Sequence, residues 1–193
     1  MNFDGESPPS RDEPAGMRDE VESFYVKTLP DAITWAASLA YGGGMGACDA
    51  EEFVHSAYAL AITRWADVRQ HPSPVGWLHL AIFNQYRNER RRRRRRREEP
   101  IDEDLAARCC VEELESMVIL NEDLIELLQG IRQLSPTQRD VLLLKLVEFT
   151  DSEIAETLGI SRSSVSTHAH RARERLKRSL LRGREVNPDG GSR

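Results

Sequence analysis

The sequence predicts an all-α protein made of two small helical domains joined by an acidic linker, the C-terminal one a helix-turn-helix. Apolar residues recur at the three- and four-residue spacing of helices, and no useful length of the chain alternates with the two-residue period of strands. Charged residues make up 31% of the 193 residues and aromatic residues only 6%, which suits small helical bundles better than a β-sandwich. A chain of this length has room for one medium domain or two small ones.

Composition excludes several classes of protein. No apolar run approaches the roughly 18 residues that a membrane span needs. Residues 1–17 are acidic, rich in Pro, Ser and Gly, and lack the apolar segment of a secretory signal, so we expect residues 1–16 to form a disordered tail. Cys48, Cys109 and Cys110 are odd in number and lack C-x-x-C spacing, which favours reduced thiols in a cytoplasmic protein over a structural zinc site.

The net charge of −5 conceals two basic segments separated by an acidic one. The formal charge is −4 over residues 1–30, +5 over 31–97, −10 over 98–130, +5 over 131–184 and −1 over 185–193. Charges act locally, within a Debye length of roughly 10 Å, so an acidic total does not exclude nucleic acid as a partner. The pattern fits two separate contacts with a polyanion, and it also fits two ordinary solvated surfaces.

The N-terminal domain, residues 17–97, begins with apolar residues at helical spacing over residues 17–41. Pro30 is expected to divide this stretch into two helices, because proline cannot continue the hydrogen-bond ladder of a helix. The glycines at 42–44 end the second of them.

Two further helices follow in the same domain. Asp49 opens a helix that runs to about Ala66, with acidic residues in its first turn. A loop over residues 71–74 precedes a helix that starts near Val75 and continues into eight arginines at 90–97. Eight consecutive arginines cover every face of a helix, so about half could reach one DNA backbone while the rest stay solvated.

The acidic linker is assigned to residues 98–128, the C-terminal domain to 129–184 and a second disordered tail to 185–193. Amphipathic spacing over residues 111–134 predicts a further helix, with its early part only partly ordered. Two roles remain open for the linker: it could fold back on the arginines, or it could mimic nucleic acid.

The C-terminal domain carries the spacing of a helix-turn-helix. Ser135-Pro136-Thr137-Gln138 and Thr150-Asp151-Ser152-Glu153 each have the residues of a capping box at a helix start. Gly159 supplies the positive φ of the turn, and Ser161 caps the next helix. Val165 is expected to anchor that helix from beneath.

The opposite face of this third helix presents short polar groups and cations suited to base edges and phosphates. An ordinary three-helix bundle with a solvated basic face is the alternative, but the capping boxes, spacing and charge together favour DNA binding. The candidate DNA-binding residues are Arg162, Ser163, Ser166, Thr167, His168, Arg171, Arg173 and Arg175, and Lys177 and Arg178 extend the basic strip.

At this point the chain resembles the extracytoplasmic-function sigma factors, small members of the sigma-70 family of RNA polymerase sigma factors. Residues 153–161, Glu-Ile-Ala-Glu-Thr-Leu-Gly-Ile-Ser, and residues 170–173, His-Arg-Ala-Arg, resemble the family's fourth conserved region. Residues 49–54, Asp-Ala-Glu-Glu-Phe-Val, resemble its second region, as does Gly76-Trp77-Leu78 followed by Asn84. The resemblance covers most of the chain and is weaker in region two.

The resemblance implies a factor that binds core RNA polymerase and two promoter elements. Region four reads the −35 element and docks on the flap of the β subunit, and region two grips the clamp coiled coil of β′ and meets the −10 element. Carried over to this sequence, the −10 contacts are Trp77, Asn84, Arg87, Asn88 and Arg90, and the polymerase contacts are Glu51, Glu52, His55 and Ser56. Members of the family are often held by an anti-sigma protein, although no residue here identifies one.

Two tryptophans flank the loop that resembles the family's specificity loop, residues 67–73. Trp65 and Trp77 could stack on unpaired bases, at roughly 1–3 kcal/mol each, or could belong to the core. The loop itself is the better candidate for holding an extruded base.

Departures from the family pattern limit what can be carried over. His55-Ser56 stands where the family usually has Gln-Glu, and Ala81-Ile82 where it usually has Ile-Ala. Ser166 and His168 often correspond to basic residues, so the −35 preference of relatives cannot be transferred. The promoter sequence, the regulon and the inducing signal do not follow from the sequence.

We expect no enzymatic activity, no cofactor and no metal, because the chain has no nucleophile–base pair in a plausible frame, no Gly-rich phosphate loop and no histidine pair on one helix face. The runner-up hypothesis is a helix-turn-helix activator or repressor that works without core polymerase. The N-terminal segment decides against a response regulator, since it lacks the parallel strands of a receiver domain.

Overall fold

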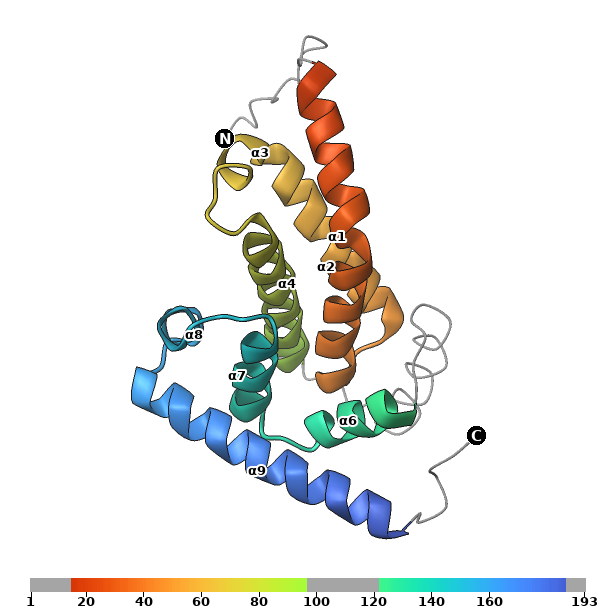
Figure 1. The fold of residues 1–193 in the computed structure, drawn as a ribbon, viewed down its shortest axis with the longest axis vertical. Helices are drawn as coiled ribbons and strands as arrows, with labels where there is room; N and C mark the ends of the chain where they lie inside the picture. Colours follow the sequence, from red (N-terminus) through yellow and green to blue (C-terminus); the bar gives the residue numbers. More distant parts are fainter. Residues whose placement is uncertain (1–14, 97–121, 187–193) are drawn as a thin grey trace.

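The computed structural model describes residues 15–96 and 122–186, and within these ranges every regular element is a helix (Figure 1). The predicted all-α fold is confirmed. Outside the described residues lie 1–14 of the expected tail (1–16), residue 97, residues 98–121 of the expected linker (98–128), and residues 187–193 of the expected C-terminal tail (185–193). The helices are α1 (Ala15–Gly42), α2 (Ala47–Thr63), α3 (Trp65–Val68), α4 (Pro74–Arg96), α6 (Glu122–Arg132), α7 (Pro136–Leu146), α8 (Asp151–Leu158) and α9 (Arg162–Val186).

Pro30 does not divide the first helix: α1 runs unbroken from Ala15 to Gly42 with Pro30 inside it. The expectation of two helices was wrong. Proline has no N–H group, so the carbonyl of Val26, four residues earlier, lacks its usual donor. Val26 is 66% exposed, so water can hydrogen-bond that carbonyl. Packing on both sides of the proline maintains the helix. Thr28 hydrogen-bonds the Tyr58 hydroxyl at 2.7 Å, and Trp35 donates to the His79 carbonyl at 3.2 Å.

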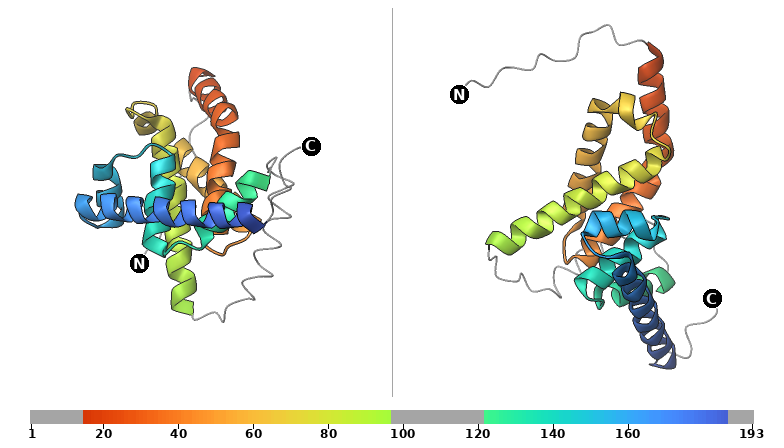
Figure 2. Two further views of the ribbon diagram at one scale, coloured as in Figure 1. Left: turned by 60° about the horizontal axis from the view of Figure 1, so that its bottom comes forward. Right: turned by 90° about the vertical axis from the view of Figure 1, so that its left-hand side faces the viewer.

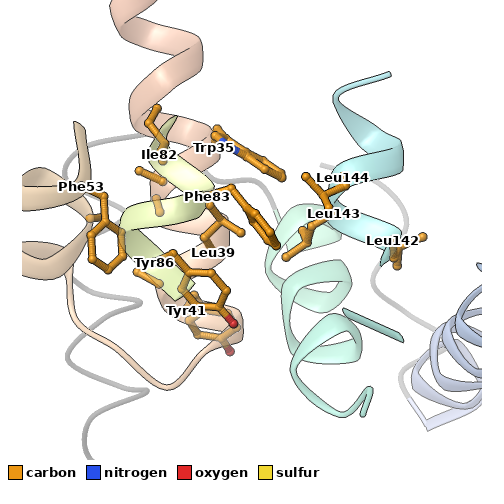
Figure 3. Close-up of a cluster of buried hydrophobic side chains, with 14 of the residues drawn as sticks. Trp35, Leu39, Tyr41, Phe53, Ile82, Phe83, Tyr86, Leu142, Leu143 and Leu144 are labelled. Atoms are coloured by element: carbon orange, nitrogen blue, oxygen red, sulfur yellow. The ribbon is translucent and has the colours of Figure 1, made fainter. Parts of the chain in front are cut away.

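The N-terminal half is a three-helix arrangement in which α1, α2 and α4 pack on one another. Phe53 of α2 meets Tyr86 of α4 edge to face, with ring centroids 6.3 Å apart. Leu39, Phe83 and Tyr86 are fully buried (Figure 3). The apolar stripes of these helices therefore form one main core, with a smaller cluster beside it at Ala61, Trp65 and Val68.

Helix α6 is the first described helix of the C-terminal half. Helix α6 starts at Glu122, so the expected domain boundary at residue 129 falls within a helix. Gly130 lets α6 approach α9 closely, because a Cβ on Gly130 would lie 2.5 Å from Cδ1 of Leu176. Helices α7, α8 and α9 follow in the expected order, and Val141, Ile154 and Val165 are fully buried between them.

The two halves share one hydrophobic cluster. Trp35, Leu39 and Phe83 of the N-terminal half lie on the side of the cluster that faces Leu143 and Leu144 of α7 (Figure 3). In Figures 1 and 2 the C-terminal helices lie against one end of α1 and beside α4, whose C-terminal end projects past them, with α9 outermost. The apolar side chains that each half contributes to this contact are therefore shielded from water.

Candidate nucleic-acid and polymerase interfaces

Local hydrogen bonds fix the ends of the two helices of the helix-turn-helix. The Thr150 N–H donates to Glu153 Oε2 at 2.8 Å, and the Glu153 N–H donates to Thr150 Oγ1 at 3.3 Å, so the predicted capping box is confirmed. Gly159 ends α8 with φ of +69°, in the left-handed region. The Ser164 N–H donates to Ser161 Oγ at 3.1 Å, which caps α9 as expected.

The other predicted capping box is absent. Ser135 occupies the position before α7 and Pro136 the first helical position, but the Ser135 side chain makes no capping hydrogen bond. Gln138 Oε1 is buried without a hydrogen-bond partner among the described residues. Proline at the first position is tolerated because the N–H group it lacks has no acceptor within the helix, and the start of α7 is held by Arg139, which donates to the carbonyls of Ile131, Arg132 and Leu134.

Helix α9 presents the predicted −35 residues on its outer face. Val165, Ala169 and Ala172 are buried beneath it, which fixes the orientation of the helix. Most candidates are exposed, whereas His168 is half-buried and its Nδ1 has no partner among the described residues. The exposed ones are Arg162, Ser163, Ser166, Thr167, Arg171, Arg173 and Arg175.

Two hydroxyls on this face already have local partners. Ser166 donates to Asp151 Oδ2 at 3.0 Å, and Thr167 donates to the Ser163 carbonyl at 2.9 Å. Asp151 also pairs with Lys145 at 2.6 Å, and the hydrogen bonds from Lys145 and Ser166 lower the pKa of its carboxyl below the ordinary value. The arginines of this face are therefore the groups most available to a polyanion.

The predicted −10 residues lie along α4, in contrasting surroundings. Asn84 and Asn88 are exposed and Trp77 is half-buried. Arg87 donates to the carbonyl of Thr157, the next-to-last residue of α8. Arg90 forms an ion pair with Asp140 of α7.

The ion pair between Arg90 and Asp140 is bidentate, with N–O distances of 2.9 and 2.8 Å. Asp140 is 3% exposed, and Arg90 also donates to the Tyr86 hydroxyl at 3.0 Å. Burial by itself would lower the pKa of the Arg90 guanidinium, but the hydrogen bonds and charge of Asp140 outweigh it and raise that pKa. Burial raises the pKa of Tyr86, and the charge of Asp140 adds to this effect.

Trp65 belongs to the core. It is 6% exposed, packs with Ala61 and Val68, and its Nε1 donates to Glu20 at 3.3 Å. Trp77 packs partly against the same cluster. The loop between α3 and α4 is tied by His71, whose Nδ1 accepts from the Ser73 N–H at 3.1 Å.

The predicted polymerase contacts share one surface of α2. Phe53, Val54 and Ala57 of this helix are buried, which turns Glu51, Glu52 and His55 to solvent, while Ser56 is half-buried. The acidic side chains lie in the first two turns of α2, near its N-terminus.

The end of α4 is strongly basic. Arg92 and Arg93 pair with Glu89, and Arg93 also reaches Asp49 at the start of α2 at 2.6 Å. The described arginines of the run that stay exposed are Arg91, Arg92, Arg94 and Arg95. The run therefore both braces α2 and offers cations to solvent.

Sequence reasoning missed Asp140 and the Thr157 carbonyl as partners of the predicted −10 arginines. Asp140 lies 50 residues from Arg90 in the chain, and no local pattern links them. A carboxylate directly before the apolar run Val141–Leu144 was a signal that could have been read, because a buried carboxylate needs a cation.

Among residues 15–96 and 122–186, no group of three or more His, Cys, Asp or Glu side chains is placed to hold a metal ion. Within the same ranges, none of the helices combines the length and apolar character needed to cross a bilayer.

Comparison with known proteins shows what this chain is similar to. Residues 124–176 match the family model described as sigma-70, region 4. No curated protein matches the chain. A structure of the sigma factor RpoE in complex with the anti-sigma factor NepR from Bartonella quintana is similar to 84% of this chain, over 98% of its own length, with 19% identity and a TM-score of 0.61.

A structure of CnrH in complex with the cytosolic domain of CnrY is similar over 86% of this chain and 90% of its own length, with 20% identity and a TM-score of 0.50. At these identities the likeness concerns the fold. The resemblance predicted from the sequence is supported: residues 124–176 match the sigma-70 region 4 family model, and the fold of the chain is similar to that of the sigma factor RpoE.

Proposed function

We propose that this chain directs promoter-specific transcription initiation as a sigma factor of the extracytoplasmic-function type. The observation that carries the proposal is the exposed basic face of α9, the second helix of a helix-turn-helix that lies within the part of the chain that matches region 4. A sigma factor contributes binding and positioning rather than chemistry, so no enzymatic activity is proposed. Because its partner is RNA polymerase, we place it in the cytoplasm.

In this proposal each half has its own ligand. Helix α9 enters the major groove of the −35 element, with arginines on phosphates and Thr167 near base edges. The N-terminal half, residues 17–97, contacts the β′ clamp coiled coil through the α2 surface formed by Glu51, Glu52, His55 and Ser56. Helix α4 contacts the −10 element, and the C-terminal half, from α6 onward, also docks on the β flap.

A protein inhibitor is a further proposed partner. The similar RpoE structure is of a complex with an anti-sigma factor. We propose a partner of this kind for the present chain.

Reconstitution tests the proposal. The full chain should co-elute with core RNA polymerase and should initiate transcription at defined promoters when start sites are mapped genome-wide. Reversing the charge of Glu51 and Glu52 to Lys should abolish co-elution, because the new lysine side chains would repel the polymerase surface that α2 is proposed to contact. The matched control reverses Asp19 and Glu22, exposed residues of α1, and should leave co-elution intact.

The activator hypothesis makes the opposite prediction. A chain that binds a specific duplex tightly without polymerase, and never shifts with the core enzyme, would be a helix-turn-helix regulator acting alone.

A further inference from the structure

The α4 surface predicted to meet the −10 element is turned toward the C-terminal half. Trp77 and Asn84 line a groove of about 980 Å³. The opposite wall of the groove includes Glu153, Glu156 and Thr157 of α8. Acidic side chains on that wall would repel the phosphates of DNA, so this conformation does not suit a −10 contact.

Three of the five N–H groups of the Arg90 guanidinium are donated where it lies. Nη1 and Nη2 each donate to one oxygen of Asp140, at 2.9 and 2.8 Å, and Nη1 also donates to the Tyr86 hydroxyl. Its guanidinium lies over the Tyr86 ring, 5.1 Å from the centroid. The same planar fork binds carboxylates and phosphates, so Arg90 can satisfy one such group at a time.

Arg87 makes a second polar contact between α4 and the C-terminal half. It donates to the Thr157 carbonyl in the last turn of α8, where helix carbonyls lack donors and carry partial negative charge. The nearby Gly159 and Ile160 N–H groups donate to the carbonyls of Glu156 and Ala155, which leaves the Thr157 carbonyl to Arg87. The guanidinium of Arg87 therefore supplies the hydrogen-bond donor for the Thr157 carbonyl at the end of α8.

We propose that Arg87 and Arg90 are a conformational latch. In the closed form seen here they hold the Thr157 carbonyl and the Asp140 carboxylate, and in the open form they bind backbone phosphates at the −10 element. The two states exclude each other because they use the same guanidinium groups. This inference rests on the proposed function and adds its regulation: the C-terminal half withholds the −10 surface until the latch opens.

The buried carboxylate is what makes the latch specific. Asp140 has apolar neighbours on α7, Val141 to Leu144, and Arg90 is the cation that pairs with it there, so removing Arg90 would leave a buried carboxylate without its partner. When the halves separate, water replaces Arg90 around Asp140, and Arg90 becomes free for a phosphate. The latch thus opens by exchange of partners and leaves no buried charge without one.

Small-angle X-ray scattering of the full chain measures the closed state directly. Asp140→Asn keeps the shape of the side chain but removes its charge, and Arg90→Gln removes the charge of the partner. Each should shift the equilibrium toward the open form by roughly tenfold or more, seen as a larger radius of gyration. Asp19→Asn, a charge change at an exposed site on α1, is the matched control and should leave the radius unchanged.

Promoter binding separates the two variants. With core polymerase, Asp140→Asn should form complexes with a −10 element faster than the wild type, because Arg90 is released. Arg90→Gln should open equally but should not gain binding, since it lacks the phosphate contact. Circular dichroism of each variant verifies that the helix content is preserved, and Arg90→Gln still tests the closed state by scattering if Asp140→Asn unfolds.

Unchanged radii in both variants would overturn the latch. Opening in both, with equal gains in promoter binding, would overturn the shared use of Arg90. If neither the wild type nor any variant binds promoter DNA with polymerase, the proposed function is wrong. The proposed exchange of Arg90 from Asp140 to a phosphate is then wrong as well. The scattering comparison would still decide whether Arg90 and Asp140 hold the halves together.

Discussion

The Cβ position of Gly43 lies 2.6 Å from Cε2 of Tyr86, closer than a real Cβ approaches, and 3.2 Å from the Leu39 carbonyl oxygen, a tight contact. Tyr86 is fully buried, and its hydroxyl accepts a hydrogen bond from Arg90. Its ring cannot move aside without disturbing both the core and the contact between the halves. Glycine is therefore the residue that allows the end of α1 to pass over α4.

Gly43→Ala should consequently destabilise the protein by about 1–3 kcal/mol, the usual cost of overpacking a core. Chemical denaturation followed by circular dichroism measures this free energy of unfolding. The matched control is Gly16→Ala, at a helical glycine with no atom within 4 Å of its Cβ position, which should be neutral or slightly stabilising. Equal losses in both variants would refute the steric explanation.

Val165→Ala tests the anchor of the helix-turn-helix. Val165 is fully buried beneath α9, so its truncation should cost about 1–3 kcal/mol of unfolding free energy through lost burial and a residual cavity. Leu181→Ala removes more apolar volume from the same helix, but Leu181 is 53% exposed, and its loss should stay within about 0.5 kcal/mol. A larger effect at Leu181 than at Val165 would mean that α9 is oriented differently.

The capping box at the start of α8 should give the domain a measurable acid sensitivity. Hydrogen bonds from the Thr150 side chain and backbone lower the pKa of the Glu153 carboxyl below its ordinary value of 4.5. A lowered folded-state pKa contributes stability that is present above the unfolded value and is lost as pH falls through the folded value. Below pH 4.5 the wild type should therefore lose more stability than Glu153→Gln, in thermal melts at stepped pH. Parallel pH profiles would show that the box does not couple to folding.

Local signals were read correctly because both partners lie within a few residues. The Thr150–Glu153 box, the left-handed Gly159 and the Ser161 cap each depend on one turn of chain, and all three are present. The predicted helix break at Pro30 and the predicted capping box at Ser135 were wrong, although they also rested on local rules. A local rule states what a residue favours, while neighbouring helices and solvent decide whether the alternative is tolerated.

Contacts between the halves could not be predicted. Arg87 and Arg90 were predicted to be −10 contacts, but their present partners lie 70 and 50 residues away. Nothing in spacing or composition links such residues, since the pairing depends on how one half docks on the other. The candidate surfaces on α2 and α9 needed no such knowledge, because the periodicity of each helix already separates its buried from its exposed face.

The exposed face of α9 predicts a division of labour in DNA binding. Arg171 is exposed and suited to a phosphate, and Thr167 lies one turn earlier on the same face. A phosphate contact adds affinity without sequence information, whereas a base-edge contact discriminates by about 1–3 kcal/mol. Changing Thr167 or His168 should therefore alter which −35 sequences are used, with Thr167 the stronger determinant because His168 is half-buried.

Arg171→Ala should instead weaken all promoters together and reduce the salt dependence of binding by about one unit of slope, because one fewer counterion is released. The assay is a −35 library transcribed by holoenzyme that carries each substitution, repeated at several salt concentrations. Arg18→Ala removes an equal charge from the exposed surface of α1 and should change neither preference nor slope. Unchanged preference in both the Thr167 and His168 variants would mean that a different face of α9 meets the bases, since the base-reading groups would then lie elsewhere on the helix.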